Sequence, residues 1–306
     1  MTTATIKRRH PERPIWEEEP TPVGKGLKGL ALTGIGLAVV FPMWVVLVTS
    51  LSPERVINKA GGLVVIPGEL SLRAYEQILS GGTVTRAVLV STGVTIVGTV
   101  FSVVLSVLAA YGLSRRGSVL HRPLLFVFLL TFLFGPGLVP SYLMVTGLGL
   151  KDSYWSLILP SAVNAFNLVV LRAFFMAIPQ ELLDSARIDG AGEWRILTRI
   201  VLPLSKAVTA VVALFYAVGY WNAFFNAVLY IDDNSMSPLQ VLLRGMVLQG
   251  TNPTGFAGPT PGTAVVAPNL AIKMAVVMLA VIPALLVFPF VQRHFTKGVI
   301  TGAVKG

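Results

Sequence analysis

The 306-residue chain lacks cysteine altogether and has few charged residues. Without cysteine it cannot form disulfide bonds, use a thiolate as a nucleophile or bind a metal through sulfur. Only 12% of its residues are charged, 54% are hydrophobic, and its mean hydropathy is +0.75. This apolar content exceeds what the core of a soluble domain of this size buries, so we expect lipid to cover the excess.

Residues that usually carry catalysis or ion coupling are also scarce. The three histidines, His10, His121 and His294, show no metal-ligand spacing, and no GxxxxGK(S/T) motif for nucleotide phosphates occurs. Every Asp and Glu lies outside the long apolar stretches, whereas a proton- or sodium-coupled carrier is expected to place carboxylates inside its spans. The sequence therefore disfavours an enzyme, a metal centre and the alternative of an ion-coupled secondary transporter.

Six uncharged apolar stretches approach or exceed the roughly 20 residues that a helix needs to cross a bilayer. They are 29–53, 87–114, 123–150, 153–171, 207–231 and 274–292. We therefore predict an all-α integral membrane protein with six transmembrane helices, although the two shortest stretches also fit buried soluble helices. Pro136, Pro140, Pro160 and Pro283 are predicted to kink or end helices.

Lysine and arginine are distributed unevenly between alternate loops. The loops that include both chain ends carry sixteen of them, the three intervening loops carry seven, and Arg172 lies close enough to a span end to snorkel. By the positive-inside rule this places the N and C termini in the cytoplasm. The net charge of +10 is thus a topology signal rather than a nucleic-acid-binding surface.

The chain divides into a polar, proline-rich cytoplasmic tail at 1–26 and a six-helix membrane domain at 27–306. Within that domain we expect four segments outside the membrane: an outer cap at 54–85, a cytoplasmic loop at 179–206, an outer loop at 232–272 and a cytoplasmic C-terminal tail at 293–306. In the cap, residues 63–66 are predicted to be extended and 72–79 helical.

The cytoplasmic loop has the pattern of two short helices joined by a glycine turn. Pro179 is placed to open the first helix, and Glu181 and Asp184 lie near its positive N-terminal end. Gly190 is placed to end that helix. The second helix is expected from Glu193 to Pro203.

In the second helix, Trp194, Leu197 and Val201 recur on one face, with two arginines on another. We expect such an amphipathic helix to lie in a groove or on the membrane. A surface helix without a partner is the alternative.

This loop resembles the cytoplasmic loop of ABC importer permeases, which usually reads Glu-Ala-Ala, two residues, Asp-Gly-Ala, and then Ile-x-Leu-Pro. The matching residues are Ala186, Asp189, Gly190, Ala191, Ile200, Leu202 and Pro203. Asp184 and Ser185 depart from the pattern, standing where Glu and Ala are usual. In that family the loop's short helix sits in a cleft of the ATPase subunit, so the resemblance implies an ATPase-coupling role for this loop.

The resemblance extends over nearly everything after residue 25. The segment from VPSYLM to LRAFF is similar to spans three and four of the sugar-importing branch, and PFVQRHFTKGVITGAVKG is similar to the end of the maltose-type second permease. The resemblance implies a non-enzymatic permease of the bacterial cytoplasmic membrane that imports a sugar, closest to complex-oligosaccharide permeases. A non-sugar solute is the alternative within this class.

The resemblance also implies partners. These are a homologous permease, two ATPases that bind ATP and Mg, and an extracytoplasmic solute-binding protein; the chain itself would hold no cofactor. The C-terminal tail is a candidate ATPase contact, or else a frayed end, through Thr301, Gly302, Lys305 and Gly306. The outer loop is a candidate docking site for the binding protein, or else a connector, through Thr251, Asn252, Pro253, Gly255, Phe256 and Thr263.

Sugars are generally held by aromatic faces and by amide or hydroxyl hydrogen bonds. Side chains of these kinds at membrane depth are candidates for a substrate cavity: Tyr142, Asn164, Asn167, Tyr216, Tyr220, Trp221, Asn222 and Asn226. Helix packing is the alternative role for each of them.

Overall fold

A computed structural model describes residues 21–80, 82–115, 120–248 and 270–303, with the backbone alone at 288 and 290–303. These residues form helices and turns, with no β-strand among them. In chain order the elements are α1 (Pro22–Ser50), α2 (Glu54–Lys59), α3 (Arg73–Leu79), α4 (Thr83–Ser114), α5 (His121–Leu133), α6 (Leu138–Gly147), α7 (Trp155–Ile158), the 3-10 turn η1 (Leu159–Ser161), α8 (Ala165–Met176), α9 (Gln180–Ile188), α10 (Glu193–Ile196), the π-helical turn η2 (Leu197–Val201), α11 (Leu202–Leu204), α12 (Lys206–Trp221), α13 (Phe225–Tyr230), η3 (Asn234–Met236), α14 (Leu239–Leu248) and α15 (Leu270–Ala303).

Within the described part of the chain, three helical segments are individually long and apolar enough to cross a membrane: α1, α4 and residues 270–287 of α15. Three helix pairs qualify only when taken together. They are α5 with α6, bent by 119°, α7–η1 with α8, bent by 52°, and α10–α11 with α12, bent by 85°. The spans thus number up to six if each bent pair counts as one, and the count of six and the cytoplasmic termini stay predictions.

The expected continuous stretch at 123–150 is interrupted in the structure. Helix α5 ends at Leu133 and α6 begins at Leu138, with Gly-Pro-Gly between them and a positive φ of 80° at Gly137. The break predicted at Pro136 is confirmed, as is the one near Pro160, which lies in η1. Pro283 instead lies inside α15, which continues through it.

The cap predicted after the first span contains α2 and α3. The predicted helix at 72–79 is confirmed by α3, whereas residues 63–66 are irregular coil. Two hydrogen bonds hold this coil to the end of α1: the Val64 N–H donates to Thr49 Oγ1 at 2.9 Å, and the Trp44 indole donates to the Val65 carbonyl at 2.9 Å. The cap is therefore fixed to the first helix rather than loosely attached.

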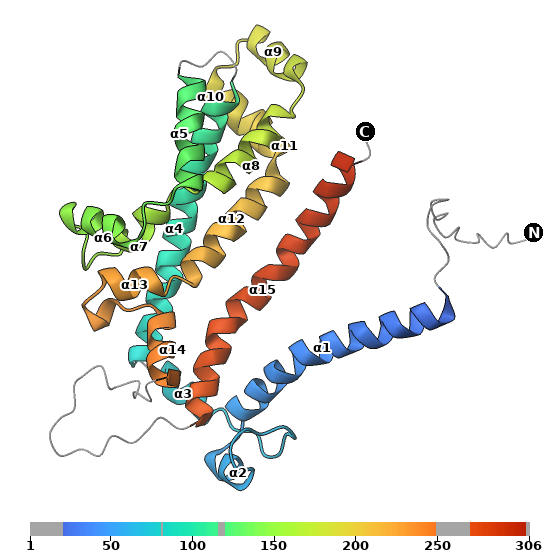
Figure 1. Ribbon diagram of the computed structural model, residues 1–306, viewed down its shortest axis with the longest axis vertical. Coiled ribbons are helices and arrows are strands. Elements are labelled where there is room, and N and C mark those ends of the chain that lie inside the picture. Colours follow the sequence, from blue (N-terminus) through green and yellow to red (C-terminus); the bar gives the residue numbers. More distant parts are fainter. Residues whose placement is uncertain (1–20, 81, 116–119, 249–269, 304–306) are drawn as a thin grey trace, which may run out of the picture.

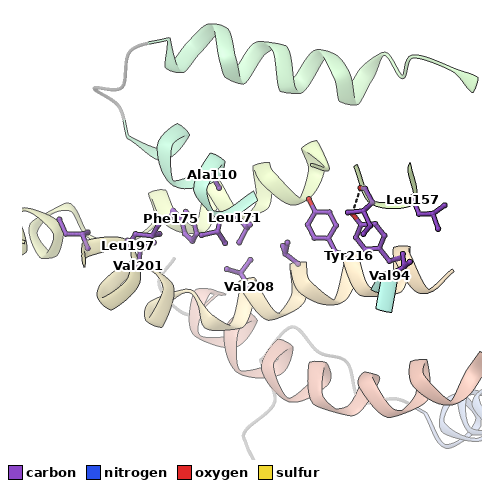
Figure 2. Close-up of a cluster of buried hydrophobic side chains, with 14 of the residues drawn as sticks. Val94, Ala110, Leu157, Leu171, Phe175, Leu197, Val201, Val208 and Tyr216 are labelled. Carbon is purple, nitrogen blue, oxygen red and sulfur yellow. Dashed lines mark hydrogen bonds between the residues drawn. The ribbon is translucent and has the colours of Figure 1, made fainter. Parts of the chain in front are cut away.

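Helix α4 runs through the centre of the bundle (Figure 1), where it packs against α12 and α8, while α15 packs against α12 and α1. One hydrophobic cluster joins α4, α7, α8, η2 and α12 (Figure 2). It includes Ala110, Leu157, Leu171 and Val212, all of which are essentially inaccessible to solvent. A second cluster, nearer the cap, joins α1, α3, α4, α14 and α15.

Much apolar surface remains uncovered. Leu27, Leu30 and Ile35 on α1 are more than 60% exposed, and Phe126 on α5 is 65% exposed. A soluble monomer rarely exposes so large an apolar surface, so these faces are suited to lipid or to neighbouring membrane helices. Figure 1 shows α1 diverging from the bundle toward its N-terminal end.

Candidate functional site

The loop at 179–206 folds as predicted into two short helices joined by a glycine turn. Pro179 is the N-cap of α9, which ends at Ile188. Gly190 has a φ of +77°, a conformation that side chains disfavour. The turn is closed by two backbone hydrogen bonds, from Gly190 N–H to the Arg187 carbonyl and from Ala191 N–H to the Ala186 carbonyl, both 2.9 Å.

The second helix differs from the prediction in the placement of Trp194. Leu197 and Val201 are each 2% exposed, but Trp194 is 68% exposed and does not share their buried face. Helix α10 has only four residues before it widens into the π-helical turn η2. The regular 3.6-residue spacing that predicted one face therefore does not persist along this segment.

The motif residues of the loop fall into two groups. Ala186, Ala191, Ile200 and Leu202 are partly buried and pack against the main hydrophobic cluster. Exposed on the surface are Glu181, Asp184, Ser185, Asp189, Gly190 and Pro203. The loop thus has an apolar side that anchors it to the bundle and an outward side free to meet another protein.

The outward side also carries two large apolar residues that sequence reasoning did not select as contacts. Ile188 is 87% exposed and Trp194 is 68% exposed, one on either side of the glycine turn. With Leu182 and Leu204, which are also exposed, they make this loop a candidate for contact with another protein. For Ile188, the available sequence signal was an isoleucine directly before Asp-Gly in a polar segment.

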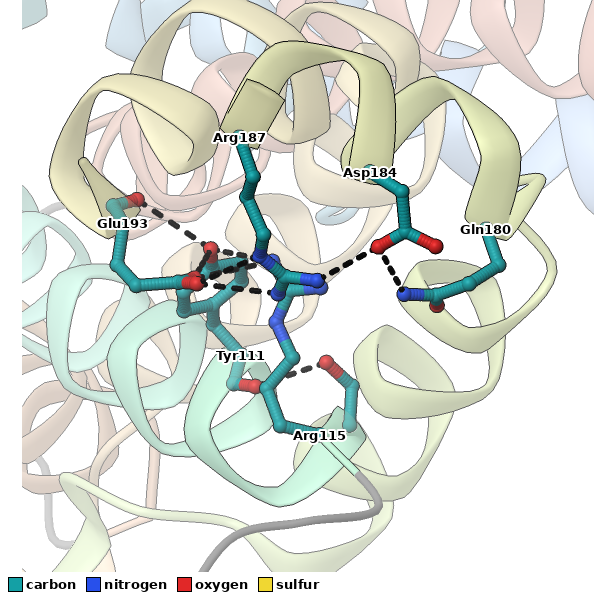
Figure 3. Close-up of polar contacts among 7 residues, drawn as sticks. Tyr111, Arg115, Gln180, Asp184, Arg187 and Glu193 are labelled. Carbon is teal, nitrogen blue, oxygen red and sulfur yellow. Dashed lines mark hydrogen bonds and ion pairs between the residues drawn. The ribbon is translucent and has the colours of Figure 1, made fainter. Parts of the chain in front are cut away.

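A polar network ties the loop to the end of α4 (Figure 3). Arg187 donates to Asp184 at 2.9 Å and to Glu193 at 3.0 and 3.1 Å, which joins α9 to α10. The Glu193 carboxylate also accepts hydrogen bonds from Tyr111 of α4 and from Arg115, which directly follows that helix. The Arg115 guanidinium in turn lies 4.4 Å from the centroid of the Tyr111 ring.

The network fixes the charge state of its central acid. The hydrogen bond from Tyr111, and then those from Arg187, hold the pKa of Glu193 below its ordinary value despite partial burial. Glu193 is therefore an ionised anchor between two arginines. A cavity of about 630 Å³ lies beside it, bounded by α4, the end of α8 and α9.

A second cavity, of about 620 Å³, lies between η1, α8, α12 and α13. It brings together six of the eight residues proposed from sequence: Asn164, Asn167, Tyr216, Tyr220, Asn222 and Asn226. Four phenylalanines that were not predicted also line it: Phe166, Phe215, Phe224 and Phe225. None of its lining residues is charged, among the residues that the structure describes.

The two tyrosines of this cavity are held by α4. The hydroxyl pairs Tyr220–Ser102 and Tyr216–Ser106 are each 2.7 Å apart. Tyr220 also donates to the Ile158 carbonyl at 3.1 Å, and Tyr216 accepts from the Asn164 N–H at 2.9 Å. Their hydroxyls are thus engaged inside the protein, and their rings are what the cavity presents.

The four asparagines that line this cavity differ in whether their side chains already form hydrogen bonds within the protein. Asn164 caps α8 by accepting from the Asn167 N–H at 3.2 Å, and the Asn222 amide donates to the Val218 carbonyl at 2.9 Å. The side-chain amides of Asn167 and Asn226 make no hydrogen bond within the described residues. These two amides are therefore available to a ligand.

The other two proposed cavity residues lie elsewhere. The Trp221 indole points to α15 and donates to the Ala280 carbonyl at 2.8 Å, and Tyr142 stacks on Tyr230 with ring centroids 6.2 Å apart. Both therefore have packing roles and do not line the cavity. Trp221 follows Tyr220 directly, so the two side chains leave α12 in different directions.

The structure describes little of the predicted ATPase contact in the C-terminal tail and nothing of the predicted docking loop. Thr301 and Gly302 lie in the last turn of α15, of which only the backbone is described, and Lys305 and Gly306 lie outside the described residues. The proposed docking residues at 251–263 also lie outside them. Arg172, by contrast, donates to the Leu113 carbonyl at 2.9 Å and so holds α8 to the end of α4.

The fold and the loop define a transport subunit. The family of inner membrane components of binding-protein-dependent transport systems matches residues 102–301, and the chain belongs to it. It is therefore a permease subunit of an ATP-binding-cassette importer, a non-enzymatic, multi-pass protein of the cytoplasmic membrane.

Particular relatives are permeases as well. The chain is 47% identical to the polygalacturonan/rhamnogalacturonan transport system permease protein YtcP of Bacillus subtilis (strain 168), across 83% of this chain and 87% of that one. It is 41% identical to Protein LplC of the same organism, across 90% and 93%. A crystal structure of a bacterial ABC transporter involved in import of the acidic polysaccharide alginate superposes with a TM-score of 0.80, at 26% identity, over 91% of this chain and 100% of that one.

Proposed function

We propose that this chain and a homologous permease form the membrane pathway of an importer for an oligosaccharide. The single observation that carries the proposal is the uncharged cavity of about 620 Å³, which presents aromatic rings and free amides together. Rings stack on the faces of sugars and amides bond their hydroxyls. Relatives named for polygalacturonan and for melibiose, raffinose and stachyose support a sugar substrate.

The outward side of the loop at 179–206 is proposed to contact an ATPase subunit, which binds the ATP and Mg. Glu181, Asp184, Ser185 and Asp189 offer polar contacts there, and Ile188 offers an apolar one. The shortened carboxylate at Asp184 is already engaged by Arg187 and Gln180. It therefore orders α9 as well as presenting charge.

A continuous path links this contact to the cavity. Helices α10 and α11 lead directly into α12, and α12 carries Tyr216 and Tyr220 into the cavity wall. The Glu193 network makes a second link, to α4, whose Ser102 and Ser106 hold the same tyrosines. Closure of two ATPases on ATP binding would thus reach the tyrosines of α12 both along the chain and through α4, and so move one wall of the cavity.

On the outer side, we propose that a solute-binding protein delivers the sugar and that residues 251–263 contact it. The tail around Thr301–Gly306 is proposed as a second ATPase contact. Both assignments rest on resemblance to the family, in which the binding protein is part of the system's name.

Gly190→Pro tests the coupling role. Proline fixes φ near −65°, whereas Gly190 needs +77°, and it removes the N–H that bonds to Arg187. We expect the variant to insert and assemble but to lose sugar-stimulated ATP hydrolysis and uptake in proteoliposomes containing the whole importer. Gly192→Ala is the matched control, because Gly192 has an ordinary negative φ and an added Cβ meets nothing within 4 Å. Full uptake by Gly190→Pro would contradict the role.

The same reconstituted importer separates a sugar from a non-sugar solute. Stimulation of ATP hydrolysis by a loaded binding protein should require an oligosaccharide. Stimulation by a phosphate ester instead would favour a non-sugar substrate, consistent with a relative named for sn-glycerol-3-phosphate.

A further inference from the structure

Beside the cavity of about 620 Å³ lies an arginine that forms no ion pair with any residue that the structure describes. Phe224, which lines the cavity, has the Arg244 guanidinium over its ring at 4.6 Å from the centroid. Arg244 is exposed and lies on α14, near the end of the bundle opposite α9 (Figure 1). A cation over an aromatic face is attracted by the ring, so Phe224 holds the charge beside the cavity.

The helix that carries Arg244 is firmly placed. Leu239, Leu242 and Met246 of α14 are almost completely buried, and the Leu239 N–H donates to Ser91 of α4 at 2.8 Å. The guanidinium is therefore positioned on a fixed backbone rather than on a loop. A positioned, exposed guanidinium with five donors is suited to a carboxylate.

Several acids at this end of the bundle are engaged with other groups, whereas Glu54 and Glu76 form no ion pair with a described residue. Asp232 pairs with Lys151 at 2.6 Å, Glu69 pairs with Arg55, and the Asp152 carboxylate accepts from the Asp232 and Asp233 N–H groups. Arg244 forms no ion pair with any described residue, and the sequence of residues 249–269 contains no Asp or Glu. Among the described residues, the guanidinium is thus left without a carboxylate partner.

We propose that Arg244 is a substrate-binding residue that pairs with the carboxylate of an acidic sugar unit at the outer edge of the cavity. The inference rests on the proposed function, because it requires the cavity to hold a sugar. In this arrangement the uncharged cavity wall contacts the rings and hydroxyls of the sugar. The Arg244 guanidinium pairs with the sugar carboxylate and so favours an acidic sugar over a neutral one. The substrate class is then an oligosaccharide containing uronic-acid units.

The test compares one uronic-acid oligosaccharide with its carboxyl methyl ester. Uptake of each is measured in proteoliposomes that contain the whole importer and saturating binding protein. The ratio of acid to ester uptake is compared between variants, so that the binding protein's own preference cancels. We expect Arg244→Gln to lower this ratio about fivefold, which corresponds to about 1 kcal/mol and to an exposed ion pair. Arg244→Lys should keep most of the ratio.

Two further variants make the test specific. Phe224→Leu should lower the ratio in the same direction, because the guanidinium loses the ring that holds it. Arg73→Gln, at an exposed arginine on α3 that lines neither of the two cavities, should leave the ratio unchanged. Unstimulated ATP hydrolysis in each preparation reports that the complex is assembled.

Each outcome decides the proposal. An unchanged ratio in Arg244→Gln, or an equal fall in the uptake of both sugars, overturns the role of Arg244 while leaving sugar import intact. Uptake of the ester but not the acid by the wild type overturns it as well. If the wild type takes up neither sugar, the inference of an acidic sugar fails. The proposed function fails as well only if no oligosaccharide stimulates ATP hydrolysis in the same importer.

Discussion

At the scale of single residues, the contact between α4 and α12 depends on the absence of a side chain at Gly98. A Cβ at this position would lie 2.9 Å from the Tyr220 ring, closer than real Cβ contacts. That ring is held in place by hydrogen bonds to Ser102 and to the Ile158 carbonyl. The glycine therefore lets the two helices approach closely and places Tyr220 at the cavity, as small residues do between membrane helices.

We expect Gly98→Ala to destabilise the protein by about 1–3 kcal/mol, as overpacking of a filled core does. Thermal unfolding in detergent measures the effect. Gly93→Ala on the same helix is the control, because an added Cβ there meets nothing within 4 Å. Equal unfolding temperatures for the two variants would show that Tyr220 can move aside and that the packing described here is not tight.

Residue type alone does not tell whether an aromatic side chain packs between helices or lines the cavity. Tyr220 and Trp221 are adjacent aromatic residues with a polar atom each, yet one lines the cavity and the other bonds to α15. The choice depends on where α12 meets its neighbours, which the sequence of α12 does not contain. Six of the eight residues predicted from sequence nevertheless line one cavity, because polar side chains in apolar membrane helices tend to face the inside of the bundle.

At the scale of elements, the short helices were predictable where local chemistry fixes them. Pro179 and Gly190 bound α9 because one suits a helix start and the other supplies a positive φ. The break between α5 and α6 was only partly predictable, since an uncharged run such as 123–150 does not show where its backbone turns by 119°. The bond between Tyr111 and Glu193, 82 residues apart, had no local signal at all.

That bond gives the stability of the loop at 179–206 a pH dependence. Because the pKa of Glu193 is lowered in the folded state, its contribution to stability is present above the ordinary pKa of 4.5. The contribution is lost as the pH falls through the lower folded value. We expect Glu193→Gln to be less stable than the wild type at pH 7 and the difference to shrink toward pH 3.

Thermal unfolding in detergent between pH 7 and pH 3 measures this dependence. Glu181→Gln is the control, since Glu181 is exposed and its carboxylate makes no ion pair within the described residues. If the unfolding temperatures of the wild type and Glu193→Gln differ by the same amount at every pH, the network does not depend on an ionised carboxylate.

At the scale of the whole molecule, the two ends of the bundle carry different features. The end with α9 and α10 presents Ile188 and Trp194 on a charged loop, and the end with α2, α3 and α14 carries the cap and Arg244 (Figure 1). Composition and charge asymmetry predicted a membrane protein whose coupling loop faces the cytoplasm. They did not predict the uncovered apolar faces of α1 and α5, because which spans lack a partner depends on packing.

The central claim is that the loop at 179–206 meets an ATPase subunit on the cytoplasmic side. Because the chain has no cysteine, Ile188→Cys carries its only thiol and can be labelled with a maleimide photocrosslinker in the assembled importer. We predict crosslinking from this position to the ATPase and none from Ser235→Cys, on the exposed turn η3 at the opposite end. Crosslinking of position 188 to the binding protein, or of position 235 to the ATPase, would contradict both the orientation and the coupling role.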